Sequence, residues 1–185
     1  MRFVPTDIPG VVVVDLDLHA DSRGFFARSW CEQEAAAHGV AFGTVQCNIS
    51  FNYRRGTLRG MHYQIAPHEE AKIVRCSAGA LFDVIVDIRP DSPSYRRFVT
   101  LELSAENRRA VHIPKGCAHG FLTLADNTEV FYQMSEYYAP GSARGFRWND
   151  PYFNITWPAA IEEISDRDRT YADFDPQVAN PAHHV

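Results

Sequence analysis

The chain has 185 residues, of which 45% are hydrophobic and 12% aromatic, a composition that supports one good hydrophobic core rather than two. We therefore expect a single domain over residues 1–175, followed by a flexible tail over residues 176–185. The formal net charge of -5 is spread without basic blocks, which excludes an electrostatic footprint for nucleic acid or for an anionic membrane.

The N-terminal segment MRFVPTDIPG lacks the apolar core of a signal peptide, and no apolar run is long enough to span a bilayer. The four cysteines, Cys31, Cys47, Cys76 and Cys117, are scattered and form no CxxC pair that would indicate zinc or a redox couple. The sequence therefore favours reduced thiols and a cytoplasmic protein that binds neither nucleic acid nor membrane.

The apolar run over residues 10–18 predicts the first strand, and a turn over 21–24 leads to a second strand over 25–30. A helix is expected over 31–37, where alanine and glutamate predominate. Short strands then recur about every ten residues, the spacing of a sandwich or barrel. They are expected at 44–49, 57–64, 72–76, 81–88, 98–103, 110–113, 120–124 and 129–134. With a short helix over 159–164, this pattern predicts an all-β protein.

Four cationic or titratable side chains lie within one predicted hairpin of apolar strands, at Arg59, His62, Lys72 and Arg75. A single strand histidine is usually a hydrogen-bonded core residue, and a strand lysine usually lies on a solvated face. Burying four such groups together without a ligand would be costly, so the hairpin predicts a concave site for an anion. Strict alternation puts Arg59 and His62 on opposite faces, so a bulge near Gly60 is required.

The motif G-x5-H ending at His62 and the segment PKGCAH ending at His119 resemble the two halves of the cupin motif. This resemblance implies a double-stranded jelly roll with a few short peripheral helices. The second histidine of a metal-binding cupin is replaced here by Gln64, whose amide oxygen is a poor ligand. A metal would keep at most His62, His119 and either Glu69 or Glu70. We therefore expect no metal and no cofactor, with a metal-dependent cupin as an alternative.

A narrower resemblance covers most of the chain. Six motifs occur in order: RGFF at 23–26, LRGMHYQ at 58–64, KIVRC at 72–76, LSAEN at 103–107, IPKGCAHGF at 113–121 and WNDP at 148–151. In this order they resemble the dTDP-4-dehydrorhamnose 3,5-epimerase family. The resemblance implies a metal-free enzyme that acts on dTDP-4-dehydro-6-deoxy-D-glucose and supplies dTDP-L-rhamnose for cell-surface polysaccharide. It also implies a homodimer in which the N-terminal strand crosses to the partner.

Epimerisation beside a ketone needs a base, a stabiliser of the enolate oxygen and an acid. The resemblance makes His62 the base, Asp168 its carboxylate partner, Lys72 the cation beside the C4 oxygen and Tyr132 the acid. It also implies a set of substrate-binding residues: Arg23 and Arg59 for the diphosphate, Gln46, Asn48 and His119 for sugar and nucleotide, Tyr138 for stacking on the base, and Phe26, Arg28 and Arg167 nearby.

Four residues depart from the family's pattern: Arg28, Cys47, His19 and Ala143 stand where the family has glutamate, aspartate, an aromatic residue and glutamate. Because Arg28 can only donate hydrogen bonds, it does not match the N3–H donor of thymine, and a CDP or GDP sugar remains open. A single-site epimerase or ketoisomerase on a related 4-keto-6-deoxy sugar nucleotide is the nearest alternative. A non-catalytic cupin that binds sugar nucleotides is the alternative from another class.

Overall fold

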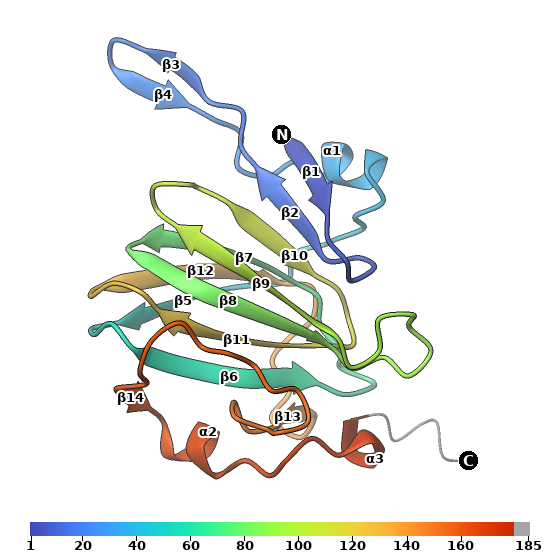
Figure 1. The fold of residues 1–185 in the computed structure, drawn as a ribbon. Helices are drawn as coiled ribbons and strands as arrows, with labels where there is room; N and C mark the ends of the chain where they lie inside the picture. The colour runs from blue at the N-terminus through green and yellow to red at the C-terminus, as the bar shows by residue number, and fades with distance from the viewer. Residues whose placement is uncertain (180–185) are drawn as a thin grey trace.

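The structure is a computed structural model that describes residues 1–179, and most of these residues form β-strands (Figure 1). The strands are β1 (Arg2–Pro5), β2 (Val12–Asp15), β3 (His19–Asp21), β4 (Gly24–Phe26), β5 (Gln46–Asn52), β6 (Thr57–Gln64), β7 (Lys72–Ala78), β8 (Ala80–Asp87), β9 (Phe98–Ser104), β10 (Ala110–Ile113), β11 (Cys117–Thr123), β12 (Thr128–Met134), β13 (Ala143–Gly145) and β14 (Glu163–Ile164). Three short helices complete the described chain: α1 (Glu32–Ala37), α2 (Asp166–Thr170) and α3 (Pro176–Ala179). None of these helices has the length and apolar character needed to cross a bilayer.

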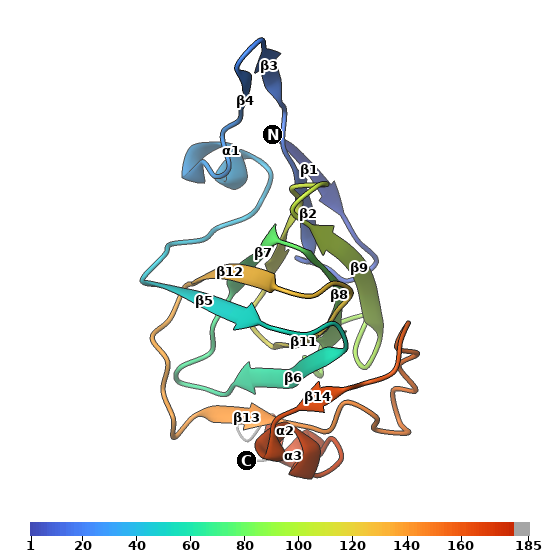
Figure 2. The same cartoon turned by 90° about the vertical axis from the view of Figure 1, so that its left-hand side faces the viewer.

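All of these strands except β3 and β4, which pair only with each other, form two sheets that face each other (Figures 1 and 2). The first sheet has the order β1-β2-β10-β7-β12-β5, and the second has the order β13-β6-β11-β8-β9 with β14 beside β6. Sequence neighbours often lie in different sheets, as β6 and β7 do, so the chain crosses repeatedly between the layers. This is the all-β double-stranded jelly roll that the strand spacing and the cupin motif predicted.

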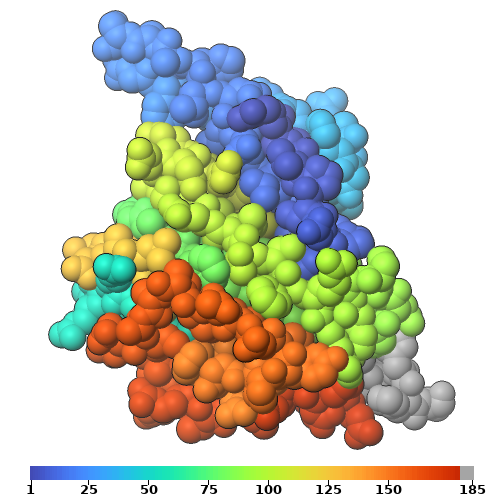
Figure 3. All heavy atoms as spheres, in the orientation of Figure 1, coloured from blue at the N-terminus to red at the C-terminus, as the bar shows by residue number. Residues whose placement is uncertain are grey.

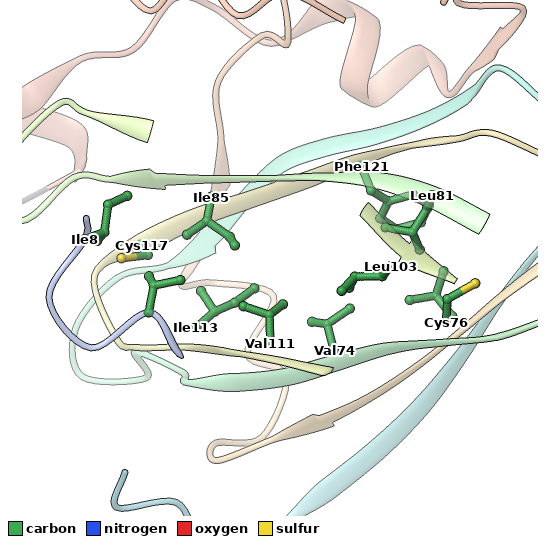
Figure 4. Packing of buried hydrophobic residues seen from close by; sticks show 12 residues of the cluster. Ile8, Val74, Cys76, Leu81, Ile85, Leu103, Val111, Ile113, Cys117 and Phe121 are labelled. Atoms are coloured by element: carbon green, nitrogen blue, oxygen red, sulfur yellow. The ribbon is translucent and has the colours of Figure 1, made fainter. Parts of the chain in front are cut away.

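The main apolar core lies between the two sheets (Figure 4). Val74 on β7 and Val111 on β10 point inward from the first sheet and meet Leu81, Ile85 and Leu103 from β8 and β9 of the second. All five side chains are almost completely buried. Alternate apolar residues on each strand therefore supply this core, as expected for sheets with one face inward.

Segments at both ends of the chain cover the outer faces of the sheets. On the second sheet, Phe146 and Phe153 stack with ring centroids 4.9 Å apart, and Phe174 packs edge-on against both. On the first sheet, Ala35 of α1 is buried in a cluster with Val14 and other apolar residues. The C-terminal segment is thus held close to β6, the strand that carries His62.

A bulge lies in β6 where the sequence required one. His62 pairs with His119 and Arg59 pairs with Phe121, so two residues of β6 face a single residue of β11. Gly60 lies in this bulge with a φ of +130°, and a Cβ there would come within 2.5 Å of the Gly120 Cα. The backbones pass too closely for any side chain. The predicted bulge is confirmed, and it turns Arg59 and His62 toward the same interior.

The N-terminal third differs most from expectation. Only Phe25 and Phe26 of the expected strand over 25–30 are extended and paired, because the one partner of β4 is the short β3 of an isolated hairpin. The strand expected to cross to a partner, over 10–18, is also shorter, and β2 pairs with β10 of its own chain. The β3–β4 hairpin is a part of this region that leaves the body of the molecule and projects outward (Figures 1 and 3).

Two expectations near the C-terminus also need correction. No helix forms over 159–164: β14 runs beside β6 at the end of this segment, and the helix α2 begins only after the N-cap Ser165. The tail expected from residue 176 begins with α3, whose Ala179 is buried in the apolar cluster that contains Phe146 and Phe153. The rest of that expected tail, 180–185, lies outside the described residues.

We predict that Gly60→Ala lowers the free energy of unfolding by about 1–3 kcal/mol or more, because it adds both a clash and a strained backbone. Gly43→Ala is the matched control, since a Cβ at Gly43 would meet no atom within 4 Å. It should change stability by less than about 0.5 kcal/mol. Urea denaturation of the three proteins checks this, and equal midpoints would contradict the account of the bulge.

Candidate active site

Two adjoining cavities open between the sheets, with volumes of about 290 Å³ and 350 Å³. His62, Lys72 and Tyr132 line both of them, so these three side chains stand where the two spaces meet. They come from β6, β7 and β12. The combined space is large enough for a small organic ligand.

Most of the residues singled out from the sequence line this space. Gln46, Asn48, Tyr138 and Arg167 line the first cavity, and Arg59 and His119 line the second. Asp168 lies behind His62 and contacts it directly. The interior therefore collects side chains from β5, β6, β7, β11, β12 and α2, which are far apart in the sequence.

Asp168 and His62 form a close pair. The His62 Nε2 lies 2.7 Å from the Asp168 Oδ1, and the Gly60 N–H donates to Asp168 Oδ2 at 3.2 Å. The Ser165 hydroxyl accepts from the Asp168 N–H at 3.1 Å and caps α2, which places Asp168 in the first turn of the helix. The Asp168 side chain is 5% exposed, whereas His62 is 41% exposed and reaches the cavity.

The hydrogen bonds to Asp168 keep it ionised. Burial alone would raise the pKa of this carboxyl group. The hydrogen bond from His62, the positive charge of the His62 ring when it is protonated, and the hydrogen bond from the Gly60 N–H together lower the pKa below its ordinary value. An ionised carboxylate only accepts hydrogen bonds, so the neutral His62 ring carries its proton on Nε2. Its Nδ1 is then unprotonated and can accept a proton from a ligand.

Lys72 and Tyr132 supply the other two polar groups at the junction. The Lys72 Nζ lies 2.9 Å from the Glu70 Oε1, and both side chains are largely buried. Tyr132 lies on β12 opposite Asn48, and burial raises the pKa of its phenol, an effect that the Arg59 charge partly offsets. The phenol therefore carries its proton at neutral pH and can donate it.

The remaining polar groups are held by neighbours rather than free to move. The Arg59 Nε donates to the Asn52 side chain at 2.7 Å. Gln46 donates to the Asn48 side chain at 3.1 Å. His119 forms a second histidine–aspartate pair, with its Nε2 2.7 Å from the Oδ1 of the fully buried Asp83. The walls of the cavity are thus ordered before any ligand enters, which lowers the entropy cost of binding.

The position of the missing metal ligand is occupied by a structural amide. Gln64 donates to the His68 and Tyr137 carbonyls and accepts from the Ala139 N–H, so all of its strong hydrogen-bonding groups are used within the protein. Among residues 1–179, no three histidine, cysteine or acidic side chains gather in a way that could hold a metal ion. The residues present do not form the ligand set considered from the sequence.

Three expected substrate-binding residues lie outside the cavity of their own chain. Arg23 pairs with Asp21 at 2.6 Å in the β3–β4 hairpin, and Phe26 is 72% exposed there. Arg28 follows the hairpin and pairs with Glu34 of α1 at 2.6 Å. The hairpin projects at the end of the molecule away from α2 (Figure 1), the helix that contains Asp168. Within one chain, these residues cannot reach a ligand bound beside His62.

The barrel and its ordered polar interior place the protein among the cupin-like jelly rolls whose chemistry is carried by side chains within the barrel. Comparison with known proteins narrows this class. The chain belongs to the dTDP-4-dehydrorhamnose 3,5-epimerase family, whose family model matches residues 5–175.

Individual relatives are similar to this protein in sequence and structure over almost the whole chain. The dTDP-4-dehydrorhamnose 3,5-epimerase of Shigella flexneri is 42% identical over 171 residues, covering 91% of this chain and 93% of that protein. The Bacillus anthracis enzyme, solved with TDP and PPi bound, superimposes with a TM-score of 0.91 at 37% identity and covers 94% of this chain and 99% of its own. A Legionella pneumophila epimerase in complex with dTDP-4-keto-L-rhamnose gives a TM-score of 0.89 at 34% identity, with 97% of each chain covered. Sugar-nucleotide ligands therefore occur in this family.

The roles of three residues at the site were not predicted from the sequence. Asp83 reads as part of a core strand, although it pairs with His119. Tyr171 packs edge-on against His62, with ring centroids 6.0 Å apart, from beyond α2. Glu70 was considered only as a metal ligand, yet it pairs with Lys72. Of the three, only Asp83 had a signal in the sequence: an acidic residue within an apolar strand is expected to be buried and paired, which could have predicted a histidine partner.

We predict that Asp168→Asn removes a pH-dependent part of the stability. Since the folded-state pKa of Asp168 is lowered, its contribution is present above the unfolded value near ~3.9 and is lost as the pH falls through the folded value. At pH 7 the variant should be less stable by about 1.5–3 kcal/mol. Urea denaturation from pH 7 down to about 3 should show the difference from wild type shrinking in acid. A difference that stays constant with pH would contradict the ionised pair.

Proposed function

We propose that this protein inverts C5 and C3 of dTDP-4-dehydro-6-deoxy-D-glucose and so produces dTDP-4-dehydro-L-rhamnose. The observation that carries this proposal is the placement of His62 on the second sheet and Tyr132 on the first, with both side chains lining the same two cavities. A sugar ring between the sheets would offer one face to each residue. Removal of a proton from one face and its return to the other is the requirement for epimerisation.

In the proposed reaction, the unprotonated Nδ1 of His62 takes the proton from C5. The electron pair left on carbon moves into an enolate, whose charge develops on the C4 oxygen beside the Lys72 ammonium. Tyr132 then gives its proton to C5 from the opposite face. The resulting imidazolium and phenolate return to their starting states by exchange with water, so no oxidant or reductant is required. The same sequence at C3 completes the double inversion.

Asp168 supports the base without reacting. Its carboxylate fixes the ring tautomer through the 2.7 Å contact with Nε2 and stabilises the imidazolium that forms. Arg59 lines the second cavity with a guanidinium that suits a diphosphate, and Gln46, Asn48 and His119 offer hydrogen bonds to the sugar and nucleotide. Tyr138, half exposed at the rim of the first cavity beside Arg167, suits stacking on the base.

The residues of the hairpin enter this proposal through a second copy of the chain. We place Arg23, Phe26 and Arg28 in the partner's site of a homodimer, because Arg23 and Phe26 are exposed on a projecting hairpin, where Arg23 pairs with Asp21 of the same hairpin and neither residue lines the cavities of its own chain. The exchanged element is then the β3–β4 hairpin, and β2 stays in its own sheet. Domain exchange of this kind yields a closed, two-fold symmetric dimer.

The pair formed by Arg28 and Glu34 bears on the choice of base. Glu34 neutralises Arg28 and places a carboxylate beside its guanidinium. A nucleotide base bound there would therefore meet a hydrogen-bond acceptor as well as the arginine. dTDP is therefore the proposed nucleotide, with CDP and GDP as the alternatives. Calorimetric titration separates them: tighter binding of CDP or GDP than of dTDP, lost in Arg28→Glu, would transfer the activity to another sugar nucleotide.

Alternative functions on the same fold can be distinguished by experiment. A single-site epimerase would invert C3 only, a ketoisomerase would move the carbonyl, and a non-catalytic cupin would bind without changing the sugar. A metal-dependent enzyme would lose activity with a chelator and regain it with one metal. We place the reaction in the cytoplasm, as four free thiols favour, where the product can enter dTDP-L-rhamnose synthesis.

We predict that His62→Asn lowers turnover by about 10²–10⁴-fold, equivalent to roughly 3–5 kcal/mol of barrier, because the base is lost. Calorimetric binding of dTDP should remain close to wild type. With Tyr132→Phe, the C5 proton of the substrate should still exchange with solvent, but C5 should not be inverted. His68→Asn changes an exposed side chain that lines neither cavity; it is the control and should keep the wild-type rate. Normal turnover in His62→Asn would contradict the assignment of the base.

We predict that two inactive variants restore each other if the site is shared. Arg23→Ala lacks a group in the hairpin, and His62→Asn lacks the base, so a mixed dimer would contain one site with both residues intact. When equal amounts of the chains are refolded together, half of the dimers are mixed and one of their two sites is intact, which predicts roughly a quarter of wild-type activity. No recovery, together with a monomeric mass by light scattering, would contradict the shared site.

A further inference from the structure

Glu70 is a buried acid at the centre of a site that otherwise presents cations. Its side chain is 4% exposed, and its Oε1 lies 2.9 Å from the ammonium of Lys72, which is 12% exposed. Lys72, Arg59, Arg144 and Arg167 also line the cavities, whereas Glu70 is the one acidic residue among the described lining residues. An acid so close to a site for an anionic ligand opposes binding, so its presence needs a separate reason.

The local backbone holds Glu70 and Lys72 in one arrangement. The Ala71 N–H donates to the Ser135 hydroxyl at 2.8 Å, and the Ser135 N–H donates to the Ala71 carbonyl at 3.0 Å. This reciprocal pair fixes the chain between the two charged residues. The chain held at Ala71 keeps the two flanking side chains close enough for their 2.9 Å contact.

The two charged groups depend on each other. Within residues 1–179, Glu70 is the only side chain that contacts the Lys72 ammonium as an ion pair, and the Glu70 Oε2 is buried without a hydrogen-bond partner. The neighbouring Gln64, by contrast, is held by three backbone groups. An ammonium has three donors, so contact with Glu70 leaves two for a ligand and fixes their direction.

We propose that Glu70 is a positioning residue that aims the Lys72 ammonium at the carbonyl oxygen of the substrate. The inference rests on the function proposed above, which assigns the C4 oxygen to Lys72. A lysine has a flexible four-carbon stem, and a single acceptor at a fixed position restricts where its charge can lie. The carboxylate weakens the attraction of Lys72 for the diphosphate and directs the ammonium toward the sugar. Its contribution is therefore to turnover rather than to binding.

The first test measures the position of the lysine independently of activity. The sequence contains only two lysines, Lys72 and the exposed Lys115, so ¹³Cε relaxation of lysine-labelled protein reports each of them separately. We expect an ordered Lys72 in the wild type, mobile in Glu70→Ala and partly ordered in Glu70→Gln, whose amide oxygen still accepts a hydrogen bond. Lys115 should be unchanged throughout. A Lys72 signal that is equally ordered in Glu70→Ala would overturn the proposal.

The second test asks whether Glu70 acts through Lys72. Glu70→Ala should lower kcat by about 10- to 100-fold, as expected for a misplaced catalytic group, while KM changes by less than about threefold. In a Lys72→Met background, the same change should lower kcat by less than about twofold. Glu69→Gln, next in the chain and outside both cavities, is the matched control and should keep the wild-type kcat.

Each outcome has a distinct meaning. An equal loss from Glu70→Ala in both backgrounds would overturn the positioning role, because it would show an effect that does not pass through Lys72. If Glu70→Ala does not fold, Glu70→Gln carries the same cycle with a near-isosteric side chain. A wild type that exchanges neither sugar proton would contradict the proposed function, whereas an active wild type with an unaffected Glu70→Ala would contradict only the role of Glu70.

Discussion

The contact between Asp168 and His62 is the interaction on which the site depends. It joins the C-terminal segment to β6, and it requires the Ser165 cap, the Gly60 N–H and the bulge to be in place together. The carboxylate is buried but receives enough hydrogen bonds to stay ionised, and the cost of its desolvation is offset within the pair. The same bonds set the tautomer of the ring. The fold thus holds the imidazole of His62 in one tautomer before a ligand is present.

The jelly roll divides its interior between stability and chemistry. Val74, Leu81, Ile85, Leu103 and Val111, which point inward from β7, β8, β9 and β10, form the packed core (Figure 4). The polar side chains of Asn48, His62 and Tyr132, from β5, β6 and β12, line the cavities. Val74 and Lys72, on the same strand, belong to the two different regions. A rigid apolar half therefore supports groups that would be unstable in a core of their own.

The periodic strands and the bulge at Gly60 could be predicted from sequence, because alternation and the steric needs of glycine are local. The motifs also indicated His62, Lys72 and Tyr132, which the fold brings to one cavity. The pairs of Glu70 with Lys72 and of Asp83 with His119 could not be predicted, since each depends on side-chain directions across the barrel. The short β3 and β4 were misjudged for a related reason: their apolar residues have no sheet of their own chain to cover.

The central claim is that proton transfer at carbons beside a ketone is carried out between His62 and Tyr132, which line the same cavities from opposite sheets. The most direct test is the wild-type reaction in D₂O, followed by proton NMR with dTDP-4-dehydro-6-deoxy-D-glucose as substrate. The account predicts that deuterium from the solvent replaces the protons at both C3 and C5 as the L-rhamnose configuration forms. Deuterium at C3 alone would restrict the enzyme to one inversion. Deuterium at neither carbon would contradict the claim.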